Sequence, residues 1–206
     1  MNQLRARSAV SPLHGRFAAV SDALPTVDDL VATERPEEPM HCLRPAAVTA
    51  ASRAFVDAFP GDTMYAVKCN PEPVILRAVR AGGVGNFDCA SISEVRLVRQ
   101  MFADAVIHFM HPVKARSAIR EAWARHGVRD FVLDTQDELA KILHEVAATG
   151  VAGQLGLIVR LALPKGDAVL DLSGKFGATP ANAAVLLQAA RHKAARLGVF
   201  RGGKEG

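Results

Sequence analysis

The sequence predicts an α/β fold in which βα units repeat around a parallel sheet. Five short apolar segments have the character of strands, and they centre near Tyr65, Phe87, Ile107, Val132 and Ile158. The centres lie about 20 to 26 residues apart, and each segment is followed by one with helical periodicity, as βα units require. Two of the segments, residues 105–109 and 155–161, are almost continuously apolar, which is typical of parallel strands.

The expected helices cover residues 71–81, 92–102, 114–126, 136–148 and 180–196. In 136–148 the apolar residues recur at helical spacing, namely Leu139, Ile142, Leu143 and Val146. The polar residues of the same helix are expected to face solvent, namely Asp137, Lys141, His144 and Glu145. Asp134 or Thr135 is the expected N-cap, and Glu138 would complete a capping box with Thr135.

Repeated βα units allow either a closed eight-stranded barrel or an open doubly wound sheet. A dinucleotide-binding sheet is disfavoured because no GxGxxG follows the first strand. A full barrel needs about 250 residues, whereas this chain has 206. Five strands are clear, and residues 197–200 offer a sixth.

The chain divides into three parts by composition. Residues 1–40, rich in proline and acidic residues, predict a partly ordered arm with one short helix near 26–33. Residues 41–199 carry the βα repeat, and residues 200–206 form a polar, glycine-rich tail.

Charge and cysteine content exclude several function classes. The net charge is +4, but 25 basic residues are scattered among 21 acidic ones, and a single Trp and a single Tyr give no nucleic-acid surface. No metal-ligand spacing is present, and Cys69 and Cys89 are expected to be small core residues. We expect a cytoplasmic protein, because the sequence shows no signal peptide and no apolar run long enough to span a bilayer.

Lys68 is the strongest candidate for chemistry. The apolar run before it predicts a strand, and Asn70-Pro71 after it predicts a turn. In a βα-barrel the C-terminal ends of the strands carry the active site. A lysine walled there by apolar groups loses its charge more readily and becomes a nucleophile toward aldehydes. The alternative is an ordinary solvated lysine at a strand end.

Several motifs resemble a known enzyme family. Tyr65-Ala66-Val67-Lys68-Cys69-Asn70 and Phe87-Asp88-Cys89-Ala90-Ser91 are similar to segments of the fold-type III pyridoxal-phosphate decarboxylases, in the ornithine decarboxylase branch. Later stretches agree in order, namely 111–114, 131–135 and 174–179. The resemblance covers roughly residues 40 to 199. It implies an alanine racemase-like (β/α)8 barrel, of which about five to six units are present.

The resemblance also implies roles for individual residues. Lys68 would hold pyridoxal 5'-phosphate as a Schiff base, and Ala66 would pack beneath the cofactor or be a plain core alanine. Asp88 would lie beside Lys68; alternatively it caps the helix after it. Arg160 would lie near the phenolic oxygen of the cofactor or near the lysine, or form a salt bridge with Asp134.

The remaining polar candidates have weaker assignments. Glu94 is either a helix-dipole partner or a site residue. Lys175 resembles a family lysine that pairs across a dimer, although a solvated loop position is favoured here. His108 and His111 are expected to be ordinary strand and loop residues, and Trp123 a packing residue.

The family resemblance implies decarboxylation of a basic amino acid, ornithine to putrescine and carbon dioxide, by a homodimer. The tail at 200–206 departs from the family, which continues with a ring-stacking histidine and a phosphate-binding loop. We therefore expect a truncated form whose own activity is doubtful. The alternatives are a non-catalytic pyridoxal-phosphate-binding or regulatory relative acting as a heterodimer partner, and an inactive fragment that aggregates.

Overall fold

The computed structural model describes residues 25–163 and 174–196. The chain forms two compact units, Met1–Leu43 and Arg44–Gly206. In the first unit the expected short helix is present as α1 (Val27–Glu34), with a capping box between Thr26 and Asp29. It ends at Arg35, whose backbone is left-handed with φ 43°. The tail predicted at 200–206 lies outside the described residues.

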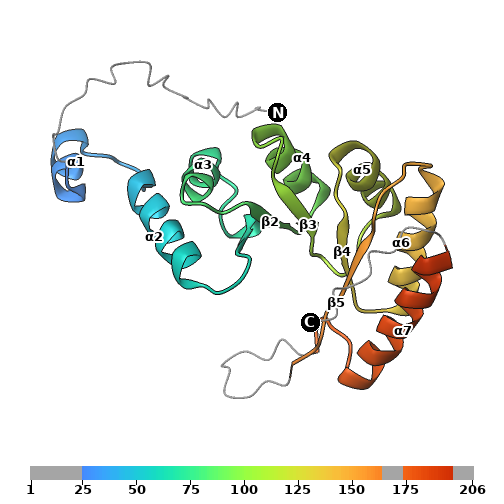
Figure 1. Cartoon of the computed structure of the whole chain (residues 1–206). Coiled ribbons are helices and arrows are strands. Elements are labelled where there is room, and N and C mark those ends of the chain that lie inside the picture. Colours follow the sequence, from blue (N-terminus) through green and yellow to red (C-terminus); the bar gives the residue numbers. More distant parts are fainter. Residues whose placement is uncertain (1–24, 164–173, 197–206) are drawn as a thin grey trace, which may run out of the picture. The chain divides into compact units, whose positions relative to one another are not determined.

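The second unit is built on five parallel strands, and all five predicted strands are confirmed. They are β1 (Met64–Ala66), β2 (Asn86–Cys89), β3 (Val106–Phe109), β4 (Asp130–Leu133) and β5 (Gly156–Val159). Their order in the sheet is β1-β2-β3-β4-β5 (Figure 1). A doubly wound sheet reverses its order at a switch point, whereas this order continues in one direction, as in a barrel. The structure is therefore a partial βα-barrel, and the sixth strand predicted at 197–200 lies outside the described part of the chain.

The helices of this unit follow the strands as predicted, within two residues at each end. They are α3 (Pro73–Ala81), α4 (Ile92–Met101), α5 (Arg116–His126), α6 (Gln136–Ala148) and α7 (Pro180–Arg196). Helix α3 begins at Pro73 rather than at residue 71, because proline is favoured in the first turn and restricts the residue before it. Helix α2 (Pro45–Ala58), which packs on α3, was not predicted.

The two faces of the sheet differ in character. Side chains that point toward the helices are buried, as are Phe87, Ile107 and Phe131. They pack with apolar residues of α3 to α7 into one core that includes the fully buried Trp123, as expected. On the other face Met64 and Val106 remain 47% and 49% exposed. This second face corresponds to the interior of a closed barrel.

Three expectations about side chains are wrong. Glu145 does not face solvent, since its side chain is 1% exposed and pairs with Arg116 and Arg120. Thr135 caps α6 by accepting from the Glu138 amide at 3.2 Å, but the Glu138 carboxylate turns to Lys114 instead of closing a capping box. Cys69 is exposed, and only Cys89 of the expected core pair is buried.

Candidate active site

Lys68 lies at the C-terminal edge of the sheet, in a 3₁₀ turn, Val67–Cys69, that follows β1 directly. The turn is shaped by its neighbours: the Tyr65 hydroxyl donates to the Asn70 carbonyl at 3.2 Å, and Asn70 Oδ1 accepts from the Glu72 amide at 3.1 Å. Val67 is buried and anchors the turn, while Lys68 is exposed. The expected apolar wall around Lys68 is therefore absent from the described part of the chain, and the amine is freely accessible.

Asp88 is a half-buried carboxylate that interacts electrostatically with Lys68. It lies in β2, and its Cα is in register with that of Ala66 in β1, so Ala66 and Asp88 point to the same face. Burial raises the pKa of Asp88 above its ordinary value, and Glu94 raises it further. Lys68, His108 and Arg160 act in the opposite direction by stabilising the carboxylate. Asp88 thus lies within electrostatic reach of both predicted site cations.

Ser91, not Asp88, caps the helix that follows β2. The Ser91 hydroxyl accepts from the Glu94 amide at 3.2 Å. The Glu94 carboxylate accepts in turn from the Ala90 amide at 2.7 Å, which assigns it to the turn at the start of α4. The capping alternative for Asp88 is therefore wrong, and its carboxylate remains available to the site.

Arg160 follows β5 directly and is exposed. Its guanidinium carbon lies 5.6 Å from the centroid of the Phe176 ring, and among the described residues it forms no ion pair with Asp134. Asp134 instead accepts from the Gly177 amide at 2.9 Å. Gly177 has φ +105°, and a Cβ there would collide with the backbone of Ala162, so a larger residue would displace this loop.

Phe176 brings further polar groups to the same edge. The Lys175 amine lies 5.8 Å from its ring centroid, and the His111 ring meets it edge-on at 5.4 Å. The loops after β3 and β5 are thereby held together beside Arg160.

The structure also shows a polar row that sequence reasoning missed. Ala66, Asp88, His108, Asp130 and Gly156 are in register across the five strands. The His108 ring lies between Asp130 of this row and Asn86, which is two residues before Asp88 on β2. The sequence indicates only that Asn86 and Asp88 lie on the same face of one strand. That His108 and Asp130 lie beside them follows from the register of the strands.

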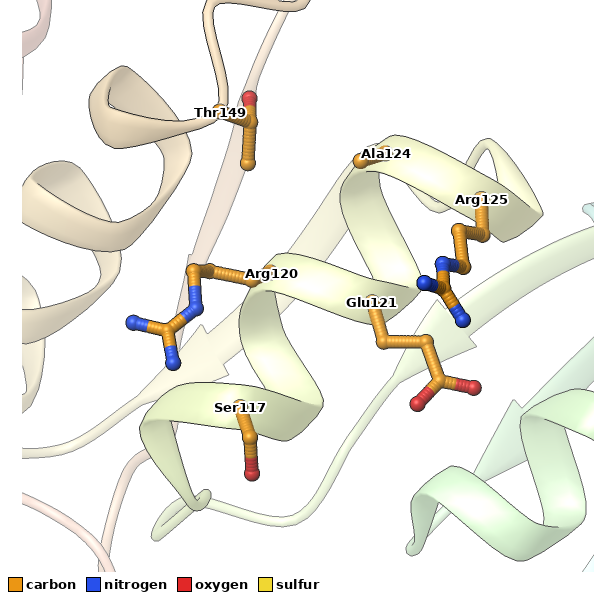
Figure 2. Close-up of a pocket in the computed structure, with 6 residues that line it drawn as sticks. All are labelled: Ser117, Arg120, Glu121, Ala124, Arg125 and Thr149. Carbon is orange, nitrogen blue, oxygen red and sulfur yellow. The ribbon is translucent and has the colours of Figure 1, made fainter.

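A shallow depression of about 350 Å³ lies elsewhere, on the helical surface (Figure 2). It is lined by residues of α5 and by the residue that follows α6, namely Ser117, Arg120, Glu121, Ala124, Arg125 and Thr149. Arg120 is paired with Glu145, and Glu121 with Arg96 at 2.6 Å. Because these helices pack on the opposite face of the sheet from Asp88, the depression is separate from the candidate site.

Comparison with known proteins identifies the lineage. The family described as "Pyridoxal-dependent decarboxylase, pyridoxal binding domain" matches residues 46–200. The chain belongs to this family. Ornithine decarboxylase of Mus musculus is 36% identical over 139 residues, which are 66% of this chain and 28% of that protein. Lysine/ornithine decarboxylase of Selenomonas ruminantium is 34% identical over 128 residues, 62% of this chain and 30% of that protein.

Solved structures agree on the fold. Arginine decarboxylase of Paramecium bursaria Chlorella virus, bound to agmatine, has a TM-score of 0.67 at 26% identity, over 87% of this chain and 48% of that one. Lysine/ornithine decarboxylase of Vibrio vulnificus, complexed with putrescine, has a TM-score of 0.61 at 30% identity, over 82% of this chain and 43% of that one. The matches cover 28% and 30% of the Mus musculus and Selenomonas ruminantium decarboxylases and less than half of these two solved chains.

The family's cofactor is pyridoxal phosphate, and a solved structure at 25% identity, described as an SrLDC mutant, is in complex with PLP. The described site fits one end of this group, because it offers an accessible primary amine with a carboxylate beside it. No helix in residues 25–163 or 174–196 is long and apolar enough to cross a membrane.

Proposed function

We propose that the chain binds pyridoxal phosphate through Lys68 and belongs to an enzyme that decarboxylates a basic amino acid, with ornithine as substrate and putrescine and carbon dioxide as products. The observation that carries this proposal is the placement of an accessible Lys68 at the C-terminal edge of β1, electrostatically coupled to Asp88 on β2. Both lie within the region that matches the pyridoxal-binding domain.

Each residue of the site has a distinct part in this proposal. Lys68 supplies the amine that holds the cofactor, and Asp88 supplies the negative charge that balances it. Arg160 offers a cation for the phenolic oxygen of the cofactor, and Ala66, without a long side chain, leaves room for its ring. The bound cofactor supplies the electron sink that decarboxylation requires.

The substrate class rests on what the relatives share. Their names refer to ornithine, lysine and arginine, and the solved neighbours hold putrescine or agmatine. All are molecules with a cationic group at the far end of an aliphatic chain. We place ornithine first because the sequence motifs resemble that branch most.

The exposure of Lys68 favours a second candidate, a pyridoxal-phosphate-binding relative without turnover. Lys68 is exposed among the described residues, whereas an amine that acts as a nucleophile is normally walled by apolar groups. Release of carbon dioxide from labelled ornithine, measured beside cofactor binding, separates the two candidates: binding without release indicates the second.

Borohydride reduction in the presence of pyridoxal phosphate, followed by peptide mass mapping, tests the cofactor role of Lys68. We expect label concentrated at Lys68 in the natural sequence and lost from that peptide in Lys68→Arg, because a guanidinium stays protonated and is not nucleophilic. Lys193→Arg is the matched control, since Lys193 is exposed on α7, away from the site. Label spread evenly over the lysines would defeat the proposal.

A further inference from the structure

The open face of the sheet carries a connected polar cluster that the proposed function does not use. The His108 side chain is only 14% exposed, and Asp130 beside it 21%. The apolar residue next to His108 on this face is Val106, two residues earlier on β3. Burying an imidazole and a carboxylate is unfavourable unless they are paired. The contacts that stabilise these two side chains therefore need to be identified.

Two polar contacts hold the His108 ring. Its Nε2 lies 3.2 Å from Asn86 Oδ1, and its Nδ1 lies 3.1 Å from Asp130 Oδ2. Both neighbouring atoms are oxygens, one of an amide and one of a carboxylate. The Nδ1 contact is electrostatic rather than a well-directed hydrogen bond.

Gly156 gives the Asp130 carboxylate its space. Asp130 is in register with Gly156 on β5, and a Cβ at position 156 would collide with Asp130 Oδ1. Because Gly156 has no side chain, Asp130 Oδ1 can lie against the backbone of β5 at this position. Asp130 Oδ2 then lies beside His108. The His108 ring is therefore positioned by residues of three other strands, namely Asn86 on β2, Asp130 on β4 and Gly156 on β5.

The position of His108 connects this cluster to the candidate site. His108 is in register with Asp88, so both side chains leave the sheet on the same face. The charged groups around Asp88 are Lys68 after β1, Glu94 on α4, His108 on β3 and Arg160 after β5. Of these, His108 is the one fixed within the sheet on both sides, since Lys68 and Arg160 are exposed.

We propose that His108, held by Asn86 and Asp130, is a positioning residue that keeps the Asp88 carboxylate ionised opposite Lys68. The inference rests on the proposed function, because the purpose of an ionised Asp88 is to balance the charge at Lys68 where the cofactor binds. His108 acts through Asp88 and does not itself touch the cofactor.

The test is a carboxyl NMR titration of Asp88 in the full 206-residue chain without cofactor. In His108→Gln we expect the titration midpoint of Asp88 to rise by about half a pH unit or more, because one nearby positive charge is lost. In Asp130→Asn, which keeps the shape of the side chain, we expect a smaller rise in the same direction. His126→Gln is the matched control, since His126 also pairs with a carboxylate, Glu121 at 3.1 Å, but on a helix.

A midpoint unchanged in both His108→Gln and Asp130→Asn, with helical circular dichroism retained, would overturn the inference. If His108→Gln does not fold, the Asp88 midpoint in Asp130→Asn is the deciding measurement, and an unchanged midpoint there would overturn the inference. Borohydride labelling of Lys68 is measured on the same samples. Failure of labelling in the natural sequence counts against the proposed function, whereas labelling with an unmoved Asp88 midpoint counts against the role of His108 alone.

Discussion

Lys114 is a charged residue whose side chain is completely buried. Its amine donates to the carbonyls of His111 at 2.9 Å and Val132 at 2.6 Å, and it lies 2.9 Å from Glu138. Burial lowers its pKa, and the Glu138 carboxylate opposes that effect. The Lys114 amide also donates to Glu138 at 3.2 Å, so the backbone and the side chain of Lys114 are both tied to α6. This one side chain fixes the loop after β3, which carries His111 to the candidate site.

Lys114→Met is therefore expected to destabilise the fold. The two carbonyls would lose their donor inside the protein, and Glu138 would keep only Lys141 and the backbone amide of residue 114. We therefore expect the free energy of unfolding to fall by about 3 kcal/mol. Urea unfolding followed by circular dichroism measures it. Lys193→Met, at an exposed position, is the control and should change stability by less than about 0.5 kcal/mol. A loss below about 1 kcal/mol in Lys114→Met would show that the ion pair is not a structural anchor.

At the scale of the elements, α5 and α6 are joined by a buried carboxylate. Glu145 on α6 accepts from Arg116 at 2.7 Å and also pairs with Arg120 and with His144 at 3.1 Å. The hydrogen bond from Arg116 is the main cause that lowers the pKa of Glu145 from 4.5 to about 2, with smaller contributions from His144 and Arg120. The stabilisation requires the ionised carboxylate. It is present above the ordinary pKa of glutamate and is lost as the pH falls toward 2.

Glu145→Gln should remove this part of the acid sensitivity. We expect the variant to melt at a lower temperature than the natural sequence at pH 7, and the difference to shrink steadily between pH 4.5 and pH 2. Melting temperatures across this pH range provide the measurement. Glu37→Gln, at an exposed position, should follow the natural sequence throughout. A difference that stays constant with pH would mean that the charge of Glu145 is not what joins the helices.

Most elements are predictable because their signal is local. Apolar runs mark the strands and the 3.6-residue period marks the helices, but α2 lies outside the βα repeat and was missed. Pairing is not local: Glu145 looks solvent-facing on its own helix, and its partner Arg116 is 29 residues away. Lys68, Asp88 and Arg160 could be predicted to lie at one edge of the sheet, because the C-terminal ends of parallel strands lie at the same edge. A lone histidine in a strand gives no such signal, so the role of His108 depends on the register.

At the scale of the second unit, the described sheet has two edge strands, β1 and β5. Edge strands carry unpaired backbone groups, and here the adjoining open face exposes Met64 and Val106. Such edges and apolar faces promote pairing with other chains. Helices α3 to α7 nonetheless pack on the sheet in a continuous hydrophobic core. The helices therefore do not require a closed barrel in order to form.

We therefore expect native-like helix content together with concentration-dependent association. Light scattering and thermal melts over a dilution series should show larger species and higher melting temperatures as protein concentration rises. A sharp melt that is independent of concentration, from a particle of monomeric mass, would contradict this expectation.

We propose that the edge formed by β1 and β2 holds pyridoxal phosphate at Lys68. The most direct test is a crystal structure of the chain after borohydride reduction with the cofactor. We expect continuous density from the Lys68 amine to the cofactor, with Asp88 on the same face of the sheet. Cofactor density joined to a different lysine, with Lys68 free, would contradict it.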